Sequence, residues 1–158
     1  MPAFVARRAK SYAISVDTRG SLLWSGGDLD GAHLICVVSE QAADDYLATL
    51  RQRQISYVVA GRDSVDLAKA VEQLGELFGI RTLLLEGGGH INGAFLAAGL
   101  VDEVSLLIAP GVDGRPEIAA VFDGMKRTPG GKAVSLKLKS FERREGDVLW
   151  LRYDVVRA

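Results

Sequence analysis

Cysteine, histidine and proline are scarce in this sequence, with one cysteine, two histidines and four prolines among 158 residues. The lone Cys36 excludes an intrachain disulfide, and its place in the apolar run LICVV predicts a buried, inert thiol. The cysteine and the histidines lie far apart in the sequence and lack the spacing of a metal site, so we expect no bound metal.

An excess of one charge and a long apolar run are also absent. The formal net charge is -1, and the basic pairs Arg7–Arg8 and Arg143–Arg144 are too short to bind a polyanion, so we expect no nucleic-acid partner. No apolar run approaches the ~18 residues that span a bilayer, and MPAFVARRAK lacks the apolar core of a secretory signal. We therefore expect a cytoplasmic protein without a membrane partner.

Apolar residues, by contrast, are plentiful. They make up 48% of a chain whose length suits one domain, which is enough for a substantial core. We find no internal repeat, low-complexity tract or linker. We therefore expect residues 1–158 to form a single domain, with residues 1–10 as an N-terminal arm.

The middle of the chain alternates between strand and helix patterns. This strand–helix alternation, repeated three times, predicts right-handed crossovers and a largely parallel sheet. The predicted strands are residues 33–39 (HLICVVS), 55–61 (ISYVVAG), 81–86 (RTLLLE) and 104–110 (VSLLIAP). The predicted helices are residues 40–54, a helix capped by Asp63 or Ser64 and ending at Gly79, and a short helix with the apolar stripe Ile91, Ala94, Phe95 and Ala98, closed by Gly99.

The two ends of the chain follow other patterns. KSYAISVD predicts a further strand, and TRG after it a turn. KAVSLKLKSFE and DVLWLRYDVV alternate apolar and polar residues, and Glu145-Gly146 between them predicts an antiparallel hairpin. A long loop is predicted from Gly111 to Gly131. Together these patterns predict one α/β domain with a mixed sheet.

Three consecutive glycines, Gly87, Gly88 and Gly89, stand between Glu86 and His90 at a predicted strand–helix junction. In open α/β sheets ligands bind beyond the carboxyl ends of the strands, where helix N-termini expose free amides. The pattern is neither G-x-G-x-x-G nor a P-loop, so spacing alone leaves a phosphate site and a tight turn equally open.

The polar neighbours of these glycines also allow two interpretations each. Glu86 can hold a substrate hydroxyl or amine, or pair with Arg81 or Arg115. His90 is either a ligand contact or an exposed surface residue. Ser39 can cap the helix after its strand or contact a nucleotide. No nucleophile–base pair is evident, so no catalytic residue is predicted.

The segment LLLEGGGHINGAFLAAGLVDEVSLLIAP resembles the glycine-rich segment of the reductase domain of riboflavin biosynthesis, the RibD C-terminal domain family. HLICVVSEQAADDYLATLRQRQISYVVAG is similar to the preceding strand–helix–strand of that family. The resemblance implies a three-layer, dihydrofolate reductase-like fold. Its mixed sheet is mostly parallel, with a C-terminal antiparallel hairpin and helices on both faces. It also implies a homodimer that uses NADPH to reduce a 5-amino-6-(5-phosphoribosylamino)uracil-like substrate, a phosphorylated pyrimidine.

The same resemblance assigns roles to particular residues. Glu86 corresponds to a substrate contact, and Ser39 to a residue near the cofactor 2′-phosphate. Glu40 follows Ser39, and its carboxylate is expected to weaken the preference for NADPH over NADH. The hydride comes from the cofactor, so orientation is needed more than an acid–base pair. The cofactor pyrophosphate corresponds to Gly87, Gly88, Gly89, His90, Ile91, Asn92, Gly93 and Ala94.

One part of the family pattern has no counterpart in this sequence. Family reductases begin with an earlier strand carrying an S-x-D-G motif, followed by a helix and strand that line the substrate pocket. SVDTRG, at Ser15 to Gly20, lies on a different strand, so the substrate role is not assigned to it. We expect a fragment of a longer reductase; the alternatives are a pocket completed by a second subunit and a catalytically inactive, truncated dinucleotide-binding or dimerisation module.

Overall fold

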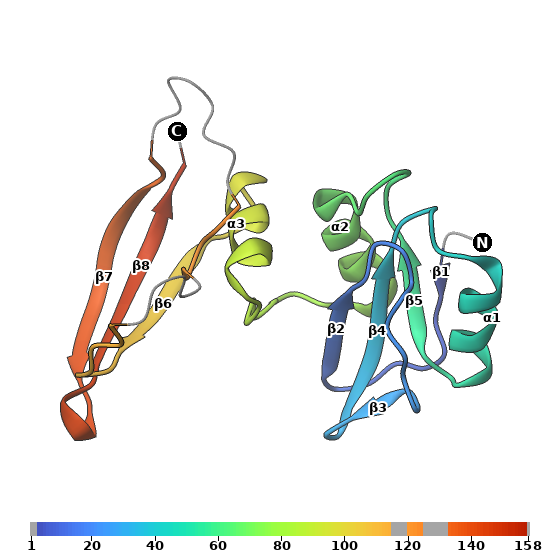
Figure 1. Cartoon of the computed structure of the whole chain (residues 1–158), viewed down its shortest axis with the longest axis horizontal. Helices are drawn as coiled ribbons and strands as arrows, with labels where there is room; N and C mark the ends of the chain where they lie inside the picture. Colours follow the sequence, from blue (N-terminus) through green and yellow to red (C-terminus); the bar gives the residue numbers. More distant parts are fainter. Residues whose placement is uncertain (1–2, 115–119, 125–132, 158) are drawn as a thin grey trace. The chain divides into compact units, whose positions relative to one another are not determined.

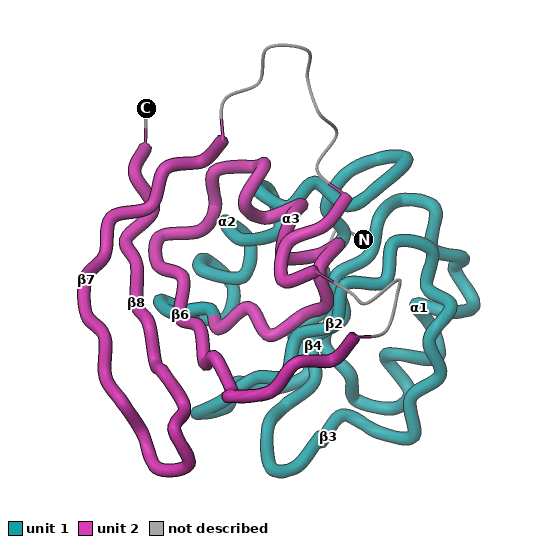
Figure 2. The backbone as a smooth tube through the Cα atoms, turned by 60° about the vertical axis from the view of Figure 1, so that its left-hand side comes forward, with its two compact units in different colours: residues 1–83 teal, residues 84–158 magenta. Residues whose placement is uncertain are grey.

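The structure, a computed structural model, describes residues 3–114, 120–124 and 133–157. It contains two compact units, which meet in the sequence between Leu83 and Leu84 (Figure 2). We call them unit 1 and unit 2 and describe each by itself. The single domain over residues 1–158 stays a prediction.

Unit 1 is built on a mixed sheet of five strands in the order β1-β5-β4-β2, with β3 paired to β4 (Figure 1). The three longer strands are parallel, as the strand–helix alternation predicts, whereas β1 and β3 pair antiparallel. The expected N-terminal arm therefore includes a strand. The elements are β1 (Ala3–Phe4), β2 (Tyr12–Val16), β3 (Asp28–Leu29), β4 (Ala32–Val38), α1 (Asp44–Gln52), β5 (Ser56–Val59) and α2 (Leu67–Phe78).

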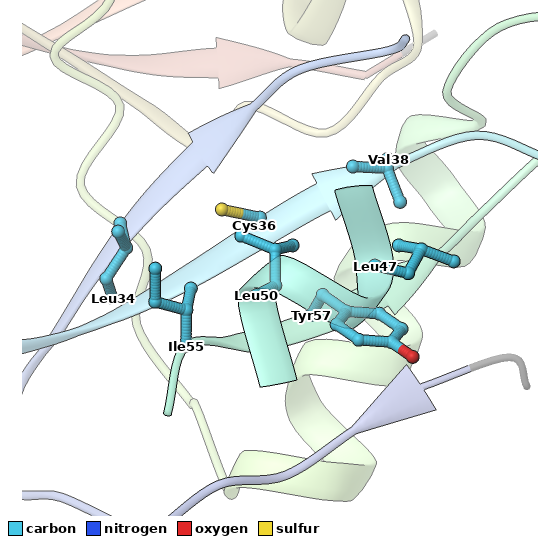
Figure 3. Close-up of a cluster of buried hydrophobic side chains, with 7 residues drawn as sticks. All are labelled: Leu34, Cys36, Val38, Leu47, Leu50, Ile55 and Tyr57. Carbon is cyan, nitrogen blue, oxygen red and sulfur yellow. The ribbon is translucent and has the colours of Figure 1, made fainter. Parts of the chain in front are cut away.

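Strand β4 contributes to two hydrophobic cores because its side chains alternate between the two faces of the sheet. Leu34, Cys36 and Val38 pack with Leu47 and Leu50 of α1 (Figure 3). The opposite face of the sheet packs against α2, through the cluster Ile35, Val37, Val58, Ala60, Ala70, Leu74 and Phe78. Helices thus cover both faces of this sheet, as the fold class requires.

Cys36 is fully buried, which confirms its prediction as a core thiol. Burial raises the pKa of this thiol to about 11. The thiol therefore stays protonated at neutral pH and is a poor nucleophile.

The boundaries of the two helices differ from the prediction. Helix α1 begins at Asp44 rather than near residue 40. Helix α2 is capped by Asp66, whose carboxylate accepts a hydrogen bond from the Lys69 N–H, so the predicted caps Asp63 and Ser64 are wrong. Gly79 ends α2 in the left-handed conformation (φ 72°), as predicted.

The described residues of unit 2 form one α-helix and an antiparallel sheet in the order β6-β8-β7. The hairpin of β7 and β8 is confirmed, and Gly146 lies in its turn with φ 73°. Strand β6 forms where VSLLIAP predicts a strand, but it is antiparallel because its partner is β8. The elements are α3 (Gly89–Ala97), β6 (Glu103–Ile108), β7 (Ser135–Arg143), a 3-10 turn η1 (Glu145–Asp147) and β8 (Leu149–Val156).

The predicted strand RTLLLE is wrong, since residues 79–88 have no regular secondary structure. Its leucines are not buried, and the Leu84 side chain is 77% exposed. Among the described residues no strand pairs with this segment, and an apolar run forms a strand only where a partner satisfies its backbone.

Apart from these differences, the α/β class, the parallel strands and the C-terminal antiparallel hairpin agree with the predicted fold. Of the predicted loop between Gly111 and Gly131, only residues 111–114 and 120–124 are described. No helix in the described part of the chain is long and apolar enough to cross a membrane.

His33, at the start of β4, is fully buried in a chain of hydrogen bonds that the sequence pattern did not reveal. The Ala6 N–H donates to Ser56 Oγ (3.0 Å), and a hydrogen bond joins Ser56 Oγ and His33 Nε2 (2.7 Å). His33 Nδ1 lies 2.9 Å from the Gly27 carbonyl oxygen and 3.2 Å from Arg7 Nε. This chain of bonds uses a neutral imidazole and ties the segment after β1 to the sheet.

We expect unit 1 to lose stability as the pH falls below about 6.5, the ordinary pKa of histidine. Burial lowers the pKa of His33, and the charge of nearby Arg7 lowers it further. The hydrogen bond to Gly27 and the charge of Asp28 act in the opposite direction. The unfolded chain then binds more protons than the folded one, so the free energy of unfolding decreases from the ordinary pKa downwards. Urea denaturation at about pH 7.5 and about pH 5 measures this loss.

His33→Asn is the informative variant, because its side-chain amide both donates and accepts hydrogen bonds and does not titrate. It should reduce the pH dependence of the unfolding free energy, whereas His90→Asn, at a side chain 83% exposed, should leave it unchanged. An equal pH dependence in wild type and His33→Asn would contradict the assignment.

Candidate functional site

Helix α3 begins within the glycine cluster, where its first amides have no hydrogen-bond partner within the helix. Gly88 is the N-cap, with extended backbone and no side-chain cap, and the first intrahelical bond runs from the Asn92 N–H to the Gly88 oxygen (3.2 Å). The N–H groups of Gly89, His90 and Ile91 therefore lack a partner within the helix. Together with the helix dipole, they favour an anion at this end.

The three glycines differ in what surrounds them. A Cβ at Gly87 would overlap with the Ile91 side chain, and a Cβ at Gly89 would overlap with the Ala120 carbonyl oxygen. A Cβ at Gly88 meets no atom within 4 Å. Packing within the protein thus accounts for the first and third glycines, and Gly88 alone is open to an approaching ligand.

The described residues Ala120–Gly124, which we call the 120–124 segment, lie against the start of α3. The Asp123 N–H donates to the Gly89 carbonyl oxygen (2.8 Å), and Asn92 Nδ2 donates to the Val121 carbonyl oxygen (2.9 Å). A Cβ at Gly93 would overlap with the backbone of Asp123, so only glycine admits this approach. The 120–124 segment therefore forms one side of the glycine turn.

His90 and Glu86 flank the turn as exposed side chains. His90 Nδ1 lies 3.5 Å from an oxygen of Asp123, which ties it to the 120–124 segment. Glu86 precedes the glycines in the irregular segment, and Arg115, one of its suggested partners, lies outside the described residues. Both side chains remain accessible to a ligand at the turn.

Ser39 lies in unit 1, directly after β4, where it lines an open pocket of about 310 Å³. Its hydroxyl is buried, donates to the Thr18 carbonyl oxygen (2.8 Å) and accepts from the Gln41 N–H (3.2 Å). Besides apolar residues, the pocket is lined by Glu40, Asp44 and Lys69. A ligand here would meet two carboxylates and one ammonium group.

The predicted site residues thus fall into two groups. Glu86 and the stretch from Gly87 to Ala94 are contiguous in unit 2, whereas Ser39 belongs to unit 1. Their assignments to substrate and cofactor stay predictions. The 120–124 segment was not predicted, because Asp123-Gly124 indicates only a turn in a long loop and no local pattern ties it to α3. Among the described residues no three His, Cys, Asp or Glu side chains are placed to hold a metal ion.

Solved structures with the same fold define the class. A pyrimidine reductase-like protein from Corynebacterium diphtheriae matches with a TM-score of 0.76 and 20% identity, over 93% of this chain and 62% of that chain. RibD from Acinetobacter baumannii matches with a TM-score of 0.68 and 21% identity, over 90% of this chain and 37% of that chain. The fold is that of the pyrimidine reductase-like α/β proteins.

Sequence comparison then gives the family. Residues 15–150 match the RibD C-terminal domain, and the chain belongs to this family. A 2,5-diamino-6-ribosylamino-4(3H)-pyrimidinone 5′-phosphate reductase from Methanothermobacter thermautotrophicus is 40% identical over 110 residues, which cover 70% of this chain and 50% of the relative. One of the same name from Aquifex aeolicus is 28% identical over 125 residues, covering 79% and 55%. The chain spans about half the length of these relatives.

Proposed function

We propose that this chain takes part in a reductase reaction of riboflavin biosynthesis, in which NADPH reduces a 5-amino-6-(5-phosphoribosylamino)uracil-like substrate. Its family and the names of its relatives support the reaction class. The observation that carries the proposal is the start of α3, where an uncapped helix N-terminus adjoins the open Gly88. These features fit a dinucleotide pyrophosphate.

The residues of this chain would bind and orient the cofactor. The N–H groups of Gly89, His90 and Ile91 donate to pyrophosphate oxygens, and Gly88 allows close approach. The family resemblance implies that Ser39 lies near the cofactor 2′-phosphate. In the unit 1 pocket beside Ser39, Lys69 would attract that phosphate, whereas Glu40 and Asp44 would repel it. Because two carboxylates face one ammonium group, this pocket does not itself favour NADPH over NADH, and NADPH is kept as the proposed cofactor because the family resemblance implies it.

When bound, the nicotinamide would supply a hydride for the ribose C1′; the bond between C1′ and the ring oxygen would break, and that oxygen would take a proton from solvent, which leaves a ribitol chain. Glu86, exposed beside the turn, would hold a polar group of the substrate. Because the cofactor carries the chemistry, the protein contributes binding and orientation. This agrees with the lack of a predicted acid–base pair.

Calorimetric titration with NADPH tests the proposal, with a dissociation constant expected in the micromolar range or tighter. NADH titrated in parallel tests the effect of Glu40. Reduction of the phosphoribosylaminopyrimidine is measured as the loss of NADPH absorbance. The absence of binding for both dinucleotides would reject the cofactor site.

A second candidate, a dimerisation module without catalysis, is favoured by an apolar face of the unit 2 sheet. Register places Leu138 of β7 beside Tyr153, and Phe141 beside Leu151, on one face of the sheet. Leu138 is 50% exposed and Phe141 68% exposed. Light scattering should then show a dimer, and NADPH should cause no thermal shift. A catalytically active homodimer, as the resemblance implies, would show both the dimer and the shift.

A further inference from the structure

The contacts around α3 assign a role to a residue that does not itself need to touch the cofactor. We propose that Asn92 is a positioning residue, which fastens the 120–124 segment to α3 and so holds the glycine turn in its binding conformation. The inference rests on the proposed function, since the turn must bind the cofactor pyrophosphate.

The first argument concerns the side-chain amide of Asn92. Its nitrogen donates to the Val121 carbonyl oxygen (2.9 Å), while its oxygen is buried and has no hydrogen-bond partner among the described residues. An unpaired buried oxygen costs free energy. The amide therefore adopts the orientation in which its nitrogen bonds to the 120–124 segment, although its oxygen then has no partner among the described residues.

The second argument concerns the peptide group between Gly89 and His90. Its carbonyl oxygen accepts a hydrogen bond from the Asp123 N–H (2.8 Å). Because a peptide group is planar, fixing this carbonyl also fixes the direction of the His90 N–H at its other end. The 120–124 segment thus orients one of the amides proposed to meet the pyrophosphate.

The third argument is that the sequence of α3 accommodates this segment. Gly89 and Gly93 lie where any side chain would overlap with the backbone of Ala120 or Asp123. Glycine inside a helix is less stabilising than alanine. These two glycines leave room for the 120–124 segment, and Asn92, which lies between them, donates a hydrogen bond to it. The sequence of α3 is therefore suited to this contact.

NADPH binding and the attachment of the 120–124 segment to α3 must then each stabilise the other. NADPH should slow hydrogen exchange of the Asp123 amide in the wild-type protein, measured by NMR. Asn92→Ala should speed that exchange and raise the NADPH dissociation constant about tenfold, with kcat at saturating NADPH changed less than about twofold. Alanine favours helix, so α3 should persist in this variant.

Ser105→Ala is the matched control, because it removes another side-chain hydrogen bond of unit 2, from Trp150 Nε1 to Ser105 Oγ (2.8 Å). It should leave the dissociation constant unchanged. A merely structural defect in Asn92→Ala would lower the fraction of competent protein, seen as stoichiometry, without shifting the dissociation constant.

Wild-type affinity in Asn92→Ala, or Asp123 exchange that NADPH does not slow, would overturn the inference while the proposed function stands. Failure of the wild-type protein to bind NADPH would overturn both. The two failures are therefore distinguishable.

Discussion

Replacing Gly88 with valine is expected to raise the NADPH dissociation constant at least about 100-fold, or about 2.7 kcal/mol. Gly88 is the one member of the triplet whose Cβ position is open, and its φ of -66° suits any residue. The fold should therefore accept valine, with at most about 1 kcal/mol lost at the N-cap of α3. The added methyl groups would occupy the space through which the pyrophosphate approaches the amides.

Calorimetry measures the affinity, and circular dichroism checks that the fold is retained. Gly26→Val is the matched control, because a Cβ there also meets no described atom within 4 Å and the residue belongs to unit 1 and is not among the predicted site residues. It should bind NADPH as the wild type does. Unchanged affinity in Gly88→Val would remove the pyrophosphate assignment. Gly89→Ala, in contrast, should disturb the structure itself, since its Cβ overlaps with Ala120.

Asp17→Ala is expected to lower the free energy of unfolding by about 3 kcal/mol. The Asp17 side chain is buried and organises the turn after β2. One carboxylate oxygen accepts from the Ser21 N–H (2.7 Å) and the Leu22 N–H (2.8 Å), and from the Tyr46 hydroxyl (3.3 Å). The other oxygen accepts from the Ser21 hydroxyl (3.1 Å). Alanine would leave these donors without their partner.

Asp17→Asn should cost only about 1 kcal/mol. Its amide oxygen can accept the three bonds made by the first carboxylate oxygen, and its amide nitrogen can donate to Ser21 Oγ. Urea denaturation measures both variants, and neither should change NADPH affinity. Equal losses for alanine and asparagine would show that the charge matters more than these hydrogen bonds. A changed affinity would instead point to the substrate role that SVDTRG was not assigned.

Local sequence patterns predict much of this fold. Strands β2, β4 and β5 follow from apolar runs, α3 from its helical stripe, and the C-terminal hairpin from period-two alternation around Gly146. The end of α2 at Gly79 follows from the left-handed conformation that glycine adopts readily. In each case the signal and the structure lie within the same short stretch of chain.

The missed features depend on partners distant in the sequence. RTLLLE has strand composition but no partner strand among the described residues. His33 looks like an ordinary strand residue until Ser56 and Gly27 are placed beside it. Several acidic or hydroxyl residues precede α2, and composition alone does not show that Asp66 is the one that caps it.

The candidate site shows the same division. The glycine triplet and the helix after it are recognisable from the sequence, so their place at the start of α3 was predictable. The different surroundings of Gly87, Gly88 and Gly89 were not, because the 120–124 segment that contacts Gly89 lies about thirty residues further along the chain.

Strand β4 illustrates how such polar contacts fix alignment. Its five residues from Leu34 to Val38 are apolar and buried. A shift of the strand by one residue would therefore move each of these side chains from one hydrophobic core to the other, and both cores would stay largely apolar. Hydrophobicity alone therefore specifies the register of β4 weakly. The polar residues at its two ends supply what is missing: His33 bonds to Ser56, and Ser39 bonds to Thr18. A one-residue insertion or deletion in this strand would break one of these end contacts while the core stays apolar. It should give a folded protein in which β4 pairs out of register, rather than an unfolded one.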